Sequence, residues 1–118
     1  MFPIALWLVK RGRAASFRAF GSSMDPIIKS GQRVKVAPVD ANRLDVGDAV
    51  VVEVNGNTML HLISAIDTGN RRVEIAGSNG AVNGWTPFDR VYAICTEIAG
   101  NPVTGAAAKT KTRRARQA

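Results

Sequence analysis

Two side chains of this sequence have the chemistry that nucleophilic catalysis requires: Ser23, in the segment Gly21–Pro26, and His61. The glycine of that segment lets the backbone turn where a side chain would clash, and its proline fixes φ and restricts the preceding residue. The bend is therefore stiff, and a hydroxyl held at a stiff bend is suited to attack a carbonyl carbon when a base lies nearby. A second interpretation is that Ser22 or Ser23 caps a short helical turn that runs into the apolar pair after the proline.

The candidate base is His61, the single histidine of the chain. Among side chains, imidazole exchanges protons most readily near neutral pH, which is the property of a general base. His61 lies in an apolar run and alternates with Met59 and Ile63 on one face of a predicted strand. That position also fits a core histidine with a satisfied hydrogen bond. The segment between Ser23 and His61 contains about three predicted strands, so a folded sheet can return the chain to the serine.

The charge of the chain is divided unevenly along its 118 residues, a length that fits one domain. The net charge is +7, but residues 1–20 and 101–118 contain no acidic residue. Residues 21–100 carry seven basic and nine acidic residues, a net charge of −2. The folded part is therefore not a basic platform for nucleic acid. Any contact with nucleic acid or an anionic membrane should come from the basic ends and be weak and salt-sensitive.

The chain has one cysteine, Cys95, and one histidine. One cysteine cannot form an internal disulfide, and one cysteine with one histidine cannot form a zinc site, so we expect no metal and no cofactor. Cys95 lies in a strand-like run and is expected to be a small buried hydrophobic residue.

Turn residues recur at intervals of about 8–12 residues between short alternating or β-branched runs, which predicts a mostly β fold. The predicted strands are Ala14–Phe20, Gln32–Ala37, Ala49–Val54, Thr58–Ile66, Arg71–Ala76 and Val91–Ile98. The continuous run Ala49–Val54 predicts a central strand, and Asn55–Asn57 predicts a tight hairpin turn. Gly77–Gly84 is predicted to be a loop, and Val91–Ile98 to close the sheet. Residues 21–100 would thus form a small antiparallel β-barrel-like domain.

Residues 1–20 and 101–118 are predicted to flank this domain. Phe2–Val9 is apolar and precedes a basic segment, but it is too short to span a bilayer, which takes about 20 residues, and it lacks the leading basic residues of a signal peptide. This run either packs on the domain as a first strand or helix, or lies on an anionic membrane surface with Trp7 among the headgroups. Residues 101–118 lack apolar periodicity and are predicted to be disordered. No compartment is assigned by these features. We expect a cytoplasmic or peripherally membrane-associated protein without a transmembrane helix.

Five short motifs occur in order between about Phe17 and Ile98. They are Gly21–Pro26 (G-x-S-M-x-P), Lys29–Val34 (x-x-G-D-x-V, with Gln32 in place of the acid), Val46–Val51 (G-D-x-V-V), Leu60–Ile63 (H-R-V-I) and Gly77–Gly84 (G-D-N-N-x-x-D-D). This series resembles the signal-peptidase and LexA-like serine peptidases, which share one small β fold. The resemblance is closest to the archaeal and endoplasmic-reticulum branch, whose members use a Ser–His pair.

The resemblance implies that Ser23 is the nucleophile and His61 the general base. The bacterial and LexA branches use a lysine as base, and this chain offers no lysine at the corresponding place. The resemblance also implies that the backbone N–H of Ser23, with a hydroxyl or amide of Gly21 or Ser22, forms an oxyanion hole. Such donors are worth about 3–4 kcal/mol each in known acyl transfer.

The chain departs from the family pattern at the acids of the last motif: Ser78 stands for the first, and Asn83 and Gly84 for the later pair. A leucine also replaces the arginine that follows the histidine. In triad enzymes a carboxylate holds the imidazole tautomer, and its removal can lower the rate by about 10⁴. Here Ser78, Asn79 or Asn83 could orient the ring through a neutral hydrogen bond, and Asp89 could also reach it.

These features predict a serine endopeptidase that acts on a protein or peptide and cleaves after small residues. Self-processing is a further hypothesis, because Ala76–Gly77 and Ala99–Gly100 are pairs of the kind that LexA-like members cut, and cleavage near the second would remove the tail. The alternative function is a catalytically impaired β domain that serves as a docking or dimerisation module, with a basic tail on nucleic acid or a membrane.

Overall fold

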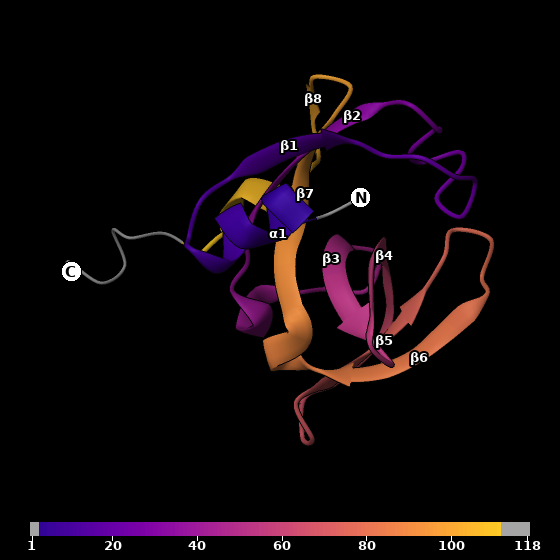
Figure 1. The fold of residues 1–118 in the computed structure, drawn as a ribbon. Helices are drawn as coiled ribbons and strands as arrows, with labels where there is room; N and C mark the ends of the chain where they lie inside the picture. The colour runs from indigo at the N-terminus through magenta and orange to yellow at the C-terminus, as the bar shows by residue number, and fades with distance from the viewer. Residues whose placement is uncertain (1–2, 112–118) are drawn as a thin grey trace.

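A single antiparallel sheet of eight strands organises residues 3–111, the part of the chain that the computed structural model describes (Figure 1). The strands are β1 (Ala15–Arg18), β2 (Arg33–Pro38), β3 (Ala49–Val54), β4 (Asn57–Asp67), β5 (Arg72–Ala76), β6 (Val82–Pro87), β7 (Val91–Ile98) and β8 (Asn101–Pro102). Their order is β1-β2-β7-β3-β4-β5-β6, with β8 paired to β7, and the sheet curls without closing. The prediction of a small, mostly β, antiparallel domain is confirmed.

The short helices lie at the connections and ends of this sheet. They are the α-helix α1 (Pro3–Lys10) and the 3₁₀ helices η1 (Ala41–Arg43), η2 (Phe88–Arg90) and η3 (Ala106–Lys109). Within residues 3–111, no helix is long and apolar enough to cross a membrane.

β3 and β7 lie side by side in the middle of the sheet and are buried on both faces. Along β3, Val51 packs into one apolar core and Val50 into a second core on the opposite face. Two buried faces require a continuous apolar run, so the prediction that Ala49–Val54 is a central strand is confirmed. Val91–Ile98 is a strand as predicted, but it does not close the sheet. Its buried side chains likewise face both cores, which favours the interior position between β2 and β3.

Two smaller sequence predictions are also confirmed. Asn55 and Gly56 adopt φ values of 51° and 81° in the turn between β3 and β4, as a tight hairpin requires. Cys95 is fully buried on β7, and burial raises the pKa of its thiol to about 11, so the thiol is an inert packing group.

The first core lies beneath α1, β1 and the loop that follows β1. Ala5 and Val9 of α1 are buried in this core, which confirms that the apolar N-terminal run packs on the domain, as a helix. β1 pairs with β2 from Ala15 to Arg18. The structure therefore has no boundary at residue 20, because the segment before it supplies both an edge strand and part of the core.

The second core is enclosed by β3, β4, β5 and β6, which curl until β6 approaches β3. The Thr86 hydroxyl of β6 donates to the Glu53 carbonyl oxygen of β3 at 2.7 Å. Gly84 permits the approach, since a Cβ there would lie 3.4 Å from Val54. β6 was not among the predicted strands, because Asn83–Thr86 has no apolar alternation. The loop predicted over Gly77–Gly84 ends at Ala81, and backbone pairing with β5 holds the rest.

Residues 101–111 are ordered, which differs from the predicted disordered tail. Ala106 is buried in the second core, and the Lys109 Nζ lies 2.8 and 2.9 Å from the two Asp48 carboxylate oxygens and 3.0 Å from Asp45. One small apolar side chain and one ion-pair cluster hold this segment, and neither produces apolar periodicity in the sequence. Residues 112–118, the rest of the predicted tail, lie outside the described residues.

We predict that Lys109→Met destabilises the domain. Burial by itself lowers the pKa of Lys109, but the bonds to Asp48 and Asp45 outweigh it and hold that pKa above its ordinary value. Loss of the ammonium leaves two carboxylates facing each other, and we expect the free energy of unfolding to fall by about 2 kcal/mol. Urea denaturation measures the change. Lys111→Met is the matched control, since Lys111 is exposed and forms no ion pair within residues 3–111. An equal loss in both variants would contradict the prediction.

Candidate active site

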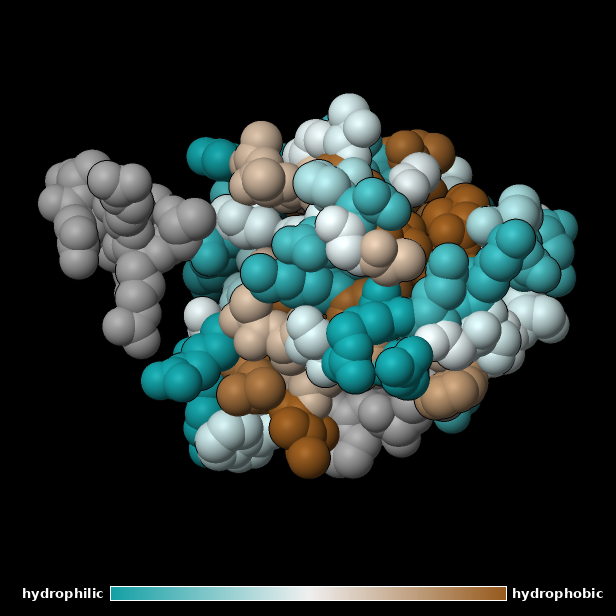
Figure 2. All heavy atoms as spheres, turned by 90° about the horizontal axis from the view of Figure 1, so that it is seen from above, coloured by the Kyte–Doolittle hydropathy of each residue, from teal (hydrophilic) through white to brown (hydrophobic). Residues whose placement is uncertain are grey.

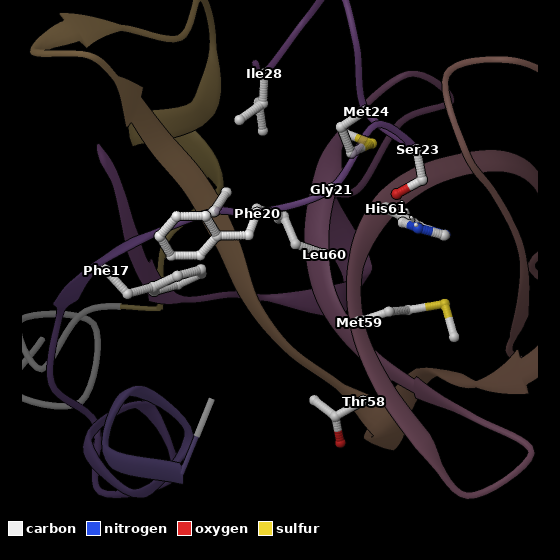
Figure 3. Close-up of a pocket in the computed structure, with 11 residues that line it drawn as sticks. Phe17, Phe20, Gly21, Ser23, Met24, Ile28, Thr58, Met59, Leu60 and His61 are labelled. Atoms are coloured by element: carbon white, nitrogen blue, oxygen red, sulfur yellow. Dashed lines mark hydrogen bonds between the residues drawn. The ribbon is translucent and has the colours of Figure 1, made fainter. Parts of the chain in front are cut away.

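Ser23 and His61 lie within hydrogen-bond distance, with 3.0 Å between the Ser23 Oγ and the His61 Nε2 (Figure 3). On the other side of the ring, the His61 Nδ1 lies 2.7 Å from the Asn83 Oδ1. An amide oxygen only accepts hydrogen bonds, so this contact places the ring proton on Nδ1 and leaves the Nε2 lone pair facing the serine hydroxyl. Ser23 is exposed and His61 is half-buried, so the pair is accessible from solvent.

β4 presents His61 at the point where the strand changes partners. On one edge His61 pairs with Val50 of β3. On the other edge, pairing with β5 begins only at Leu62, opposite Ala76. No strand within residues 3–111 pairs with β4 from Thr58 to His61 on that side. The ring is therefore held by a rigid strand beside a free backbone edge, which distinguishes it from a histidine sealed in the core.

Asn83 reaches the ring because β6 bulges there. In the ladder between β5 and β6, Ala76 pairs with Val82 and Ile75 with Gly84, so Asn83 is an extra residue between two paired positions. Gly84 follows with a φ of 136°, a conformation that favours glycine. A bulge turns a side chain away from its regular direction, and here it brings the amide against His61.

The loop that carries Ser23 is anchored by its apolar neighbours. Met24 and Ile28 are buried in the first core, and the Ile28 N–H donates to the Met24 carbonyl oxygen at 2.8 Å. Gly21 turns the chain with a φ of 105°, as its position in the sequence predicts. No helix forms between residues 19 and 32, and the Ser23 hydroxyl is bonded to the imidazole. The Ile28–Met24 bond closes a single turn, but within residues 3–111 no backbone N–H donates to the hydroxyl of Ser22 or Ser23, so neither serine caps that turn.

A second tie to this loop comes from the turn between β5 and β6. The Ser78 N–H donates to the Ser23 carbonyl oxygen at 2.8 Å, and the Ser78 hydroxyl lies 3.1 Å from the same oxygen and 2.6 Å from the Asp25 carbonyl oxygen. Ser78 thus positions the nucleophile loop and does not touch the ring. Gly77 is a residue that sequence reasoning missed. A Cβ there would lie 2.9 Å from the Ser23 carbonyl oxygen. The only sign of its role in the sequence is that this glycine directly follows the predicted strand Arg71–Ala76.

The other predicted residues are placed as follows. The Asn79 Oδ1 accepts from the Ala81 N–H at 3.0 Å and shapes the turn without reaching the ring. The ring is bonded to Ser23 and Asn83, so the structure does not bring Asp89 to it. Within residues 3–111, no group of three or more histidine, cysteine or acidic side chains is arranged to hold a metal ion.

The backbone amides around Ser23 differ in whether they are already bonded. The Gly21 N–H donates to the Ser30 Oγ at 3.1 Å, so it is not available to a substrate. Within residues 3–111, the backbone N–H groups of Ser22 and Ser23 donate to no protein acceptor. These two amides, beside an exposed hydroxyl, are donors that an oxyanion can use.

A groove of about 320 Å³ runs from the Ser23–His61 pair along the free edge of β4 (Figure 3). The nucleophile loop and β1 form one wall, and Thr58–His61 form the other. Away from the dyad its lining is mostly apolar and includes Phe17, Phe20, Ile28 and Leu60, with Thr58 as a polar residue at the edge strand. The groove therefore offers apolar contacts on one side of the dyad and an unpaired strand edge beneath it.

No protein-family model matches the sequence, and no curated protein matches it.

We predict that Gly77→Ala displaces the nucleophile loop. The new methyl would lie within 3.0 Å of the Ser23 carbonyl oxygen, so backbone must shift, and we expect a loss of about 1–3 kcal/mol in the free energy of unfolding. Reactivity of Ser23 toward a fluorophosphonate probe should fall as well. Gly69→Ala is the control, because its Cβ would make only an ordinary contact at 3.6 Å. A Gly77→Ala protein with normal stability and reactivity would show that the close approach does not matter.

Proposed function

We propose that this chain is a serine endopeptidase, with Ser23 as nucleophile, His61 as general base and Asn83 as the residue that orients the ring. The proposal rests on one observation, the continuous series of contacts from Asn83 through both ring nitrogens of His61 to the Ser23 hydroxyl. The five motifs that resemble the signal-peptidase and LexA-like peptidases support the same assignment. The three side chains come from the loop after β1, from β4 and from β6, and their mutual geometry is that of a nucleophile, a base and a group that orients the base.

The chemistry follows from the direction of these bonds. The His61 Nε2 accepts the hydroxyl proton as the Ser23 Oγ bonds to the substrate carbonyl carbon. The carbonyl oxygen becomes an oxyanion, which the free amides of Ser22 and Ser23 can bind. The protonated ring then gives its proton to the leaving amine, the peptide C–N bond breaks, and an acyl-enzyme remains. Water activated by the same nitrogen hydrolyses the ester and restores the hydroxyl.

A neutral amide does only part of what a carboxylate does in this mechanism. The Asn83 Oδ1 fixes the tautomer and direction of the ring, but it carries no charge to stabilise the imidazolium that forms when Ser23 attacks. We therefore expect slow turnover with an intact geometry.

The groove suits an extended polypeptide. The unpaired edge of β4 at Thr58–His61 offers backbone donors and acceptors to an added strand, and the apolar wall receives side chains from one face of that strand. Cleavage after a small residue is implied by the family resemblance and stays a prediction.

The structure argues against self-cleavage at the two pairs singled out in the sequence. Ala99 and Gly100 occupy a tight turn, with φ values of 50° and 82°, and are not extended as a substrate must be. Ala76 is buried at the end of β5. Removal of the segment after Gly100 would also take Ala106 out of the second core. We therefore favour a separate protein or peptide as the substrate.

We predict that Ser23→Ala and His61→Ala abolish labelling by a fluorophosphonate probe and cleavage of an apolar peptide library. The first removes the nucleophile and the second its base. Ser16→Ala is the control, since Ser16 is an exposed serine on β1 and is not among the residues lining the groove. Labelling that survives Ser23→Ala would exclude this nucleophile. A folded wild-type chain that neither labels nor cleaves would favour the alternative, a β domain that only binds.

We predict that Asn83→Ala lowers kcat by about 10²-fold or more while KM changes little, because the amide orients the ring and does not contact the substrate. The Asn83→Asp variant should be more active than the Asn83→Ala variant, because a carboxylate oxygen can also accept the hydrogen bond of the ring. It should also move the acidic limb of the kcat/KM profile to higher pH, since a carboxylate beside the ring stabilises the imidazolium. An unchanged pH profile in Asn83→Asp would show that the side chain at position 83 does not act through His61.

A further inference from the structure

α1 exposes an apolar face that the fold does not cover. Ile4 is 75% exposed and Trp7 is 53% exposed, although both are large apolar side chains. They lie three positions apart, so they share one face of the helix. The opposite face buries Ala5 and Val9 in the first core. α1 is thus fixed to the domain on one side and presents Ile4 and Trp7 to solvent on the other.

Basic side chains continue this face. The Arg11 guanidinium stacks over the Trp7 ring, 4.0 Å from its centroid. Arg13 and Arg18 are also exposed, and none of these three arginines forms an ion pair within residues 3–111. The first acidic residue of the chain is Asp25. The apolar face is therefore bordered by positive charge that no carboxylate of this segment neutralises.

We propose that α1 and the basic segment after it bind the surface of an anionic lipid bilayer. Ile4 and Trp7 enter the interface between headgroups and acyl chains, and Arg11 and Arg13 lie on the anionic headgroups. An indole ring with a guanidinium beside it matches the interface, where an apolar body and a charged group are both satisfied.

The exposed apolar side chains of this face favour a bilayer over nucleic acid. Arginines alone would serve for phosphate binding, but a nucleic-acid backbone gives no use to an aliphatic side chain as exposed as Ile4. On the face of the molecule that Figure 2 shows, hydrophobic residues reach the surface in several separate patches. An exposed apolar residue is ordinary by itself, and the acid-free basic border is what selects the face of α1.

β6 provides an internal comparison. Trp85 is 42% exposed and Arg72 stacks over its ring at 5.4 Å, an arrangement like that of Trp7 and Arg11. Arg72, however, forms an ion pair with Asp67 at 3.6 Å. The two tryptophans therefore differ in the charge around them, and they are the only two in the chain. Each can report on its own surface by fluorescence.

The test uses the full chain as the Trp85→Phe variant, which leaves Trp7 as the single tryptophan. With vesicles of phosphatidylcholine containing about 30% phosphatidylserine, we expect a blue shift of the Trp7 emission and co-sedimentation of the protein. Both should be lost in about 0.5 M NaCl and with vesicles of phosphatidylcholine alone. The reciprocal Trp7→Phe variant, which leaves Trp85, should show no blue shift.

Ile4→Ser in the Trp85→Phe background should weaken binding by about fivefold or more, since an interfacial apolar side chain is lost. The exposure of Ile4 means that this change should leave the urea midpoint unaltered. Unchanged Trp7 emission on anionic vesicles would overturn the proposal. So would equal binding by the Ile4→Ser variant, or binding to a DNA duplex but not to vesicles. None of these readouts depends on peptidase activity, so the proposal stands or falls separately from the proposed function.

Discussion

The carbonyl oxygen of Ser23, which accepts hydrogen bonds from Ser78, joins the two parts of the molecule that the site needs. One part is the loop after β1, which carries the hydroxyl and is anchored in the first core through Met24 and Ile28. The other is the curled sheet β3–β6, which carries the imidazole and the amide. Within residues 3–111, β1 forms no backbone ladder with β4 or β5, so strand pairing does not directly fix the loop after β1 against the strand that carries the imidazole. The hydrogen bonds from the turn at Gly77–Ser78 set their separation at the point where the hydroxyl and the ring must meet.

This arrangement leaves no room for a side chain at position 77, where a Cβ would lie 2.9 Å from the Ser23 carbonyl oxygen. The carbonyl oxygen that accepts the hydrogen bonds from Ser78 belongs to Ser23, the residue that also carries the nucleophilic hydroxyl. Any displacement of this carbonyl therefore moves the hydroxyl. A glycine lets the turn approach that carbonyl directly. Asn83, whose amide contacts His61, lies in β6, two residues after the connection ends at Ala81. The segment from Ser78 to Asn83 therefore holds the serine through its backbone carbonyl and the histidine through its Nδ1 atom.

Much of the fold was predictable because its signals are local. The β-branched run Ala49–Val54 and the Asn55–Gly56 turn give a central strand and a hairpin from neighbouring residues alone. The closeness of Ser23 and His61 was expected from the resemblance of five motifs to a peptidase family, because the residue types alone fitted a capping serine and a core histidine as well. The structure places the two side chains 3.0 Å apart.

What the sequence could not reveal depends on contacts between distant segments. β6 lacks apolar alternation and is a strand because β5 pairs with it. The choice among Ser78, Asn79 and Asn83 as the partner of the ring was settled by a bulge, which periodicity does not encode. Lys109 reads as one more basic residue of a tail until the fold sets Asp48 opposite it.

The unpaired edge of β4 at Thr58–His61 has a further consequence for how the protein behaves with copies of itself. An exposed strand edge pairs with any extended backbone, and a second molecule at high concentration offers the same donors and acceptors as a peptide. Here the open stretch spans only four residues, because pairing with β5 begins at Leu62. The nucleophile loop forms the opposite wall of the groove in which this stretch lies. A short edge that lies within a groove is a poor template for a neighbouring folded sheet, so this edge favours a single extended segment over a second copy of the domain.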